Sequence, residues 1–118
     1  MILRLALTTG LMAGTAGAQQ VSEAEGVVLR GLDKISGQVY DIEMKSGQTA
    51  AFEQLRITLN SCRFPVGNPS GDAFAALEIA DALDGSTVFS GWMIASAPAL
   101  SAMDHARYDL WVMRCTTS

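Results

Sequence analysis

The sequence predicts an all-β fold: a small single-domain β-sandwich or barrel of about seven short strands, closed by one disulfide. Several short segments alternate apolar and polar residues, which is the period of a half-buried strand. Glycine, asparagine, aspartate and proline lie between these segments and mark turns. With 118 residues, the chain has room for one domain.

Residues 1–18 are predicted to be a secretory signal peptide that is cleaved near Ala18. Met1–Arg4 supplies a short positive region, Leu5–Thr15 is apolar or small, and Ala16–Ala18 fits a small-x-small cleavage site. The alternative is a single membrane helix, but the apolar run falls short of the about 20 residues that a span needs. We therefore expect an exported protein with no transmembrane segment of its own after cleavage.

The mature chain is acidic. The whole sequence has a net charge of −4, and removal of the leader takes away only Arg4, leaving seven Lys and Arg against twelve Asp and Glu. This balance argues against nucleic acid and anionic lipid as partners. A domain of this size buries a modest fraction of its surface and gains from a covalent link.

The first half of the domain is expected to form strands separated by turns. Residues 19–26 are polar and small and predict a flexible lead-in, so the domain is expected to span 27–118. A first strand is predicted over 27–32, a second over 39–43, and a short one over 49–52. The next strand candidate is 55–60, with its inward residues at Leu55, Ile57 and Leu59.

The segment 74–83 is ambiguous, because its alanines favour a helix whereas its larger apolar residues alternate. We favour a strand, since strands flank it and Asp84-Gly85 is a strong hairpin signal leading into a return strand over 88–93. Asp81 interrupts the alternation.

Residues 95–103 are small and apolar around a proline, which predicts a loop with one helical turn. The last strand is predicted over 108–114. Both of its faces are largely apolar, so we expect it near the middle of the packed structure.

Cys62 and Cys115 are expected to form a structural disulfide, because an even pair in an oxidising compartment usually does. A redox pair and a pair of metal ligands are the alternatives. Redox cysteines are usually close in sequence, and these two are not.

Catalytic and cofactor motifs are sparse. His105 is the only histidine, with Asp104 and Asp109 nearby, but no nucleophile motif accompanies it. It is expected to be a loop histidine bonded to backbone, with a pH-sensitive contact as the functional alternative. No phosphate-binding loop or full set of metal ligands is apparent, so we expect no cofactor and no metal.

The bulky residues of the C-terminal third are either core or an exposed patch that docks on a partner. Aromatic and methionine side chains are enriched at interfaces, although a domain of this size also needs them in its core. The candidate patch residues are Trp92, Met93, Met103, His105, Tyr108 and Trp111.

Several motifs together resemble one family, an exported alphaproteobacterial domain of unknown function labelled DUF2155. They are LRGLDK at 29–34, FEQLRIT at 52–58, FSGWMIASAPALSA at 89–102 and YDLWV at 108–112, with the two cysteines and His105 between and after them. The chain departs from the family pattern in two places. The loop at 63–72 has less proline and glutamate, and Asp104-His105-Ala106 stands where Glu-His-Pro is usual.

The resemblance implies a small periplasmic protein and carries over no catalytic residue. We expect a non-enzymatic interaction or accessory module with a protein partner, docked on a membrane-embedded complex such as respiratory complex I, with which the family is associated. The alternatives are a binder of small ligands or glycans in the envelope, which needs a concave apolar pocket, and a hydrolase, which needs a carboxylate and a serine at His105.

Overall fold

The computed structural model describes residues 20–117, so the predicted signal peptide lies outside the described residues. Eight strands and one short 3-10 helix make up this part of the chain, and no α-helix occurs in it. The elements are β1 (Val21–Glu23), β2 (Gly26–Asp33), β3 (Val39–Lys45), β4 (Thr49–Phe52), β5 (Leu55–Pro65), β6 (Phe74–Asp81), β7 (Thr87–Ile94), η1 (Pro98–Ser101) and β8 (Tyr108–Thr116).

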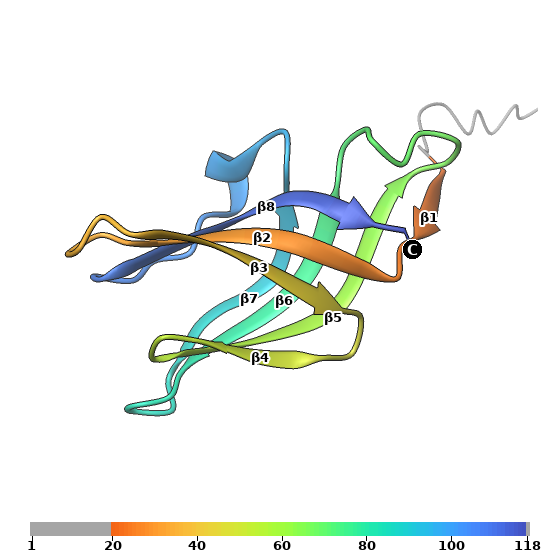
Figure 1. Ribbon diagram of the computed structural model, residues 1–118. Coiled ribbons are helices and arrows are strands. Elements are labelled where there is room, and N and C mark those ends of the chain that lie inside the picture. The colour runs from red at the N-terminus through yellow and green to blue at the C-terminus, as the bar shows by residue number, and fades with distance from the viewer. Residues whose placement is uncertain (1–19, 118) are drawn as a thin grey trace, which may run out of the picture.

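The strands form two antiparallel sheets, as Figure 1 shows. One sheet has the order β1-β5-β6-β7, with β4 also paired to β5, and the other has the order β3-β2-β8. The expected all-β class, the single domain and the single disulfide are confirmed.

The core lies between the two sheets, and the alternation of the strands decides which side chains enter it. Leu55, Ile57 and Leu59 of β5 are fully buried, as their spacing predicted. Leu77 and Ile79 of β6 are buried beside them. From the other sheet come Val27 and Leu29 of β2 and Leu110 and Val112 of β8.

The ambiguous segment is a strand as far as Asp81. It pairs with β5 on one side and with β7 on the other, so both of its backbone edges are occupied by ladder hydrogen bonds. Two ladders outweigh the helical propensity of its alanines, because strand preference depends mostly on packing and pairing. The predicted hairpin follows, and β7 returns along β6.

The expectation of a flexible lead-in over 19–26 was wrong for most of that segment. Val21–Glu23 forms strand β1, which pairs with Pro65, Phe64 and Arg63 of β5. The next residue, Ala24, is buried, and its N–H donates to the carbonyl of Cys62 at 2.7 Å. The reason is that β5 continues beyond the predicted end at residue 60 and offers a free edge there.

The expectation that the last strand lies in the middle was also wrong. β8 pairs only with β2, which is the central strand of its sheet. Its second apolar face is explained by η1 instead, because Pro98, Ala99 and Trp111 line one hollow between η1 and β8.

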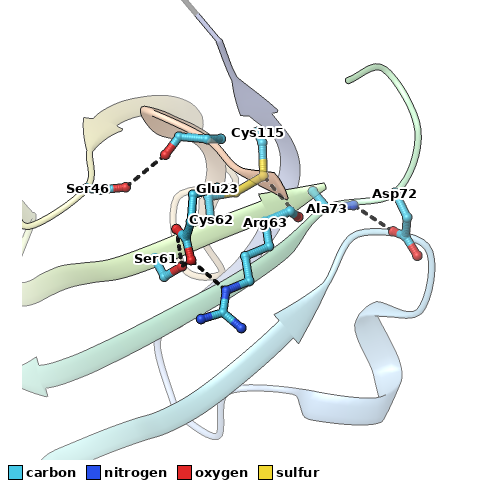
Figure 2. The surroundings of a disulfide bond; sticks show 9 residues. Glu23, Ser46, Ser61, Cys62, Arg63, Asp72, Ala73 and Cys115 are labelled. Atoms are coloured by element: carbon cyan, nitrogen blue, oxygen red, sulfur yellow. Dashed lines mark hydrogen bonds and ion pairs between the residues drawn. A yellow bond between two sulfur atoms is a disulfide. The ribbon is translucent and has the colours of Figure 1, made fainter. Parts of the chain in front are cut away.

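The two sheets are tied together at both ends. At one end the Cys62–Cys115 disulfide joins β5 to β8 (Figure 2). The two Cα atoms are 5.8 Å apart. At the other end the segment before β8 is held by two buried carboxylates, Asp33 from β2 and Asp81 from β6.

Candidate interaction surface

The structure separates the six residues of the predicted patch. Met93, Met103 and Tyr108 are core residues, with exposed fractions of 3%, 7% and 2%. Trp92 is 42% exposed on the five-stranded sheet, whereas Trp111 is half-buried on β8 in the other sheet. The patch as predicted is therefore not one surface, and Trp92 is its exposed member.

The physical reason is the period of the strand. Successive side chains of a strand point to opposite faces of the sheet. Trp92 and Met93 are neighbours in β7, so one of them faces solvent and the other enters the core.

Trp92 lies in a largely apolar surface built from four strands, which we call the Trp92 surface: Val21, Phe74 and Trp92, with Arg63 among them. These four residues line a shallow hollow of about 290 Å³. The register explains the grouping, because Arg63 lies opposite Phe74 and Trp92 lies opposite the next outward residue of β6. Val21 reaches the surface because β1 pairs along this part of β5.

The Arg63 guanidinium is held in place from two sides. It lies over the Trp92 ring, 5.0 Å from the ring centroid. Its Nε donates to the Glu23 carboxylate at 2.6 Å, and the Ser61 hydroxyl donates to the same carboxylate at 2.7 Å. Figure 2 shows Glu23, Ser61 and Arg63 beside the disulfide. The hydrogen bond from Ser61, followed by that from Arg63, lowers the pKa of Glu23.

Sequence analysis did not place Val21 or Phe74 in this surface. Val21 fell in the expected lead-in, and Phe74 was assigned only to an ambiguous segment. The one available signal for Phe74 was the alternation of side chains along β6. Phe74 is an odd number of residues from the inward Leu77 and Ile79, so its side chain points to the opposite face.

His105 has both of its ring nitrogens engaged. Nδ1 accepts the backbone N–H groups of Arg107 and Tyr108, at 3.0 and 3.2 Å. The neutral ring therefore carries its proton on Nε2, which donates to Asp81 Oδ2 at 3.0 Å. The hydrolase alternative required a serine at this ring, and the nitrogen that would accept the serine proton faces backbone N–H groups instead.

Asp81, rather than Asp104 or Asp109, is the carboxylate at His105. Its Oδ1 also accepts the N–H of Leu83 at 2.9 Å. The signal in the sequence was the break in alternation at Asp81, because a carboxylate at an inward position needs a hydrogen-bond partner when the strand packs.

Asp33 anchors the same segment from the opposite sheet. Arg107 Nη2 donates to its Oδ2 at 3.0 Å, and the N–H of Ile35 donates to its Oδ1 at 3.0 Å. The Arg107 hydrogen bond is the main cause that lowers the pKa of Asp33 to about 2. The Arg107–Asp33 ion pair and the His105–Asp81 hydrogen bond therefore hold a loop in place between the sheets.

A larger hollow lies at the end of β3 beside the last residues of β8. Its volume is about 640 Å³, and it is lined by Glu43, Met44, Lys45, Ser46, Gln48 and Thr116, whose apolar atoms contribute most of the exposed lining. The hollow is open to solvent rather than enclosed, unlike the concave pocket that the ligand-binding alternative predicts.

Residues 20–117 lack two features that would point to other functions. No group of three or more histidine, cysteine, aspartate or glutamate side chains is arranged to hold a metal ion there. In the same part of the chain, no helix is long and apolar enough to cross a membrane.

The fold and the surface define a small β-domain of two antiparallel sheets, linked by a disulfide and carrying an exposed aromatic site on one sheet. The chain belongs to the family described as "Uncharacterized protein conserved in bacteria (DUF2155)", whose model matches residues 27–115. The resemblance seen in the motifs is thereby confirmed.

One relative is "Uncharacterized protein RP359" of Rickettsia prowazekii (strain Madrid E), which is 26% identical over 87 residues. The match covers 71% of this chain and 56% of the relative, so the chain spans little more than half of that protein's length. No solved structure matches the chain at a significant level.

Proposed function

We propose that this domain is a non-enzymatic periplasmic accessory module that binds a protein partner through the Trp92 surface. The observation that carries the proposal is Trp92 itself, a large aromatic side chain left 42% exposed beside Val21, which is 39% exposed. A folded domain of this size gains stability by burying such a side chain, so its exposure favours a role in binding.

The chemistry of the surface fits a protein interface. Tryptophan and arginine are the residues most enriched among those that dominate binding energy. Arg63 is already fixed by Glu23 and by the Trp92 ring, so little side-chain freedom is lost when a partner covers it.

A flat strand face also suits a protein better than a small molecule. The Trp92 hollow is shallow, and the larger hollow near Thr116 is open to solvent rather than enclosed. These features support docking over the ligand-binding alternative.

The partner that the family resemblance favours is a membrane-embedded complex, such as respiratory complex I, contacted on its periplasmic side. Gentle detergent purification of the tagged protein from its host, followed by mass spectrometry, is expected to recover one complex in stoichiometric amount. If the protein instead purifies without a partner, the result would favour the ligand-binding alternative.

A photo-crosslinking experiment tests the surface directly. A benzophenone amino acid in place of Trp92 is expected to crosslink to the partner in living cells. The matched control is the same amino acid at Leu83, which is 77% exposed in the β6–β7 turn. Equal crosslinking at the two positions, or crosslinking at Leu83 alone, would contradict the proposed surface.

A further inference from the structure

The geometry of β7 points to the kind of partner that the Trp92 surface fits. We propose that β7 binds an extended segment of another protein, which adds to the five-stranded sheet as a further strand. This inference rests on the proposed function and deepens it, because Trp92 belongs to β7. Strand addition draws its affinity from backbone hydrogen bonds and its selectivity from side chains at alternate positions.

The other sheet edges carry the features that prevent strand addition. β1 and β4 are short, at three and four residues. β3 carries three charged side chains, in the sequence VYDIEMK. β8 carries an aspartate and an arginine, and its Leu110 N–H is satisfied by the Asp109 carboxylate at 2.8 Å. Short length and charge are the usual means by which proteins protect an edge.

β7 has neither the short length nor the charge of those edges, although η1 packs against the end of the strand. It is eight residues long, with the sequence TVFSGWMI, and contains neither a charged residue nor a proline. It pairs with β6 on one side only. A register shift near Ile79 disturbs the start of the strand, so the register with β6 is continuous only from Phe89 to Ile94, with Gly91 at a φ of 152° within this stretch.

The register identifies the backbone groups on the free edge. The N–H of Ala95 donates to the carbonyl of Ala73, which fixes the phase of the ladder between β6 and β7. By alternation, the backbone groups of Ser90, Trp92 and Ile94 point away from β6.

Most of these outward backbone groups have no hydrogen-bond partner within residues 20–117. The Ile94 carbonyl accepts the N–H of Ala97 at 3.2 Å. Within residues 20–117, no hydrogen bond engages the N–H groups of Ser90, Trp92 and Ile94 on this edge, or the carbonyls of Ser90 and Trp92. A strand placed here therefore finds alternating donors and acceptors.

Side chains beside the edge set the chemistry of the segment. A strand added to β7 would place one side chain next to Trp92 and another next to Ser90. An apolar side chain of the added strand fits next to the Trp92 ring. Ser90 lies opposite Glu78, which is exposed and forms no ion pair within the described part of the chain, so a cationic side chain fits there.

Charge decides between a foreign segment and a second copy of this chain. The protein has a net charge of −4, so two copies repel each other whereas a basic segment is attracted. The occupant that fits is an extended, apolar and basic segment of another protein.

The test uses a capped synthetic peptide of about eight residues, the length of an ordinary strand, in which threonine alternates with two valines and one lysine. Amide hydrogen exchange of the mature domain is followed by NMR with and without the peptide. Saturating peptide is expected to slow exchange at Ser90, Trp92 and Ile94 at least tenfold. A version methylated on alternate backbone nitrogens is expected to have no effect, and one with glutamate for lysine is expected to bind more weakly.

Two proline variants provide a matched comparison. Ser90→Pro removes an outward N–H from β7 and leaves the hydrogen bonds to β6 intact, so it is expected to weaken peptide binding at least tenfold. Val39→Pro does the same on the charged edge strand β3, where Val39 is 54% exposed, and is expected to leave binding within twofold of wild type.

The outcomes separate this inference from the proposed function. If Trp92→Lys abolishes partner crosslinking at Val21 and Ser90→Pro does not, the docking surface is right and strand addition is wrong. If neither variant affects crosslinking, both proposals fall. Unchanged exchange at the three amides with about 1 mM peptide overturns strand addition. Slowed exchange that depends on protein concentration alone would assign the edge to a second copy instead.

Discussion

Removal of the Cys62–Cys115 disulfide is expected to lower the free energy of unfolding by about 4 kcal/mol. The two cysteines are 53 residues apart in sequence. In the chain-entropy model, a crosslink over such a loop removes about 14 cal/mol/K from the unfolded chain, which is about 4 kcal/mol at 25 °C. For a domain of about 100 residues, this corresponds to a fall in melting temperature of about 20 °C.

The assay is urea unfolding of the mature domain with and without a phosphine reductant. Reduction leaves both sulfur atoms in place, so the difference reports the crosslink rather than a loss of core volume. Mass spectrometry of the oxidised protein is expected to show a chain two hydrogens lighter than the reduced one.

A double variant with Cys62→Ala and Cys115→Ala provides the control. It is expected to unfold at the same urea concentration with and without the reductant. Alanine is preferred to serine, because Cys62 is fully buried and a hydroxyl there would add its own cost. A difference below about 1 kcal/mol between oxidised and reduced wild type would refute the loop-entropy reasoning.

Two further predictions concern the core and the Asp33 ion pair. Gly31→Ala is expected to destabilise the domain by about 1–3 kcal/mol, because its added Cβ would lie 2.7 Å from the ring of buried Phe52. Adding Phe52→Leu to this variant should restore part of the lost stability, as measured by urea unfolding. If Gly31→Ala alone stabilised the domain, that result would contradict the packing. The pKa of Asp33 is about 2, below its ordinary value of 3.8, so its contribution to stability is present above about pH 4 and is lost as the pH falls toward 2. Carboxyl NMR titration of Arg107→Gln should show the Asp33 pKa rising toward 3.8, and an unchanged pKa would show that Arg107 is not its main cause.

Local pattern was a good guide to the strands and a poor guide to their neighbours. Alternation located the inward residues of β5, and the Asp84-Gly85 signal located the β6–β7 hairpin. The short strand β1 was missed because three residues show almost no period, and its strand geometry depends on the free edge that β5 provides.

The candidate site was predicted in part. Trp92 was selected for its residue type, and it is exposed. Met93 and Tyr108 were selected for the same reason, and they are buried, because residue type alone does not tell which face of a sheet is covered. Val21 and Phe74 joined the site through pairing between strands that are far apart in the chain.

The sequence by itself determined the all-β class, the cysteine pair, the family and the inward face of the central strands. These follow from composition, local period and motifs, which are properties of neighbouring residues. Only the tertiary structure decided that Asp81 is the partner of His105, that β8 is an edge strand, and that β7 presents an uncharged free edge. Such features depend on which strands lie side by side. The pairing of strands is set by packing between distant segments, so no single segment of the chain predicts it.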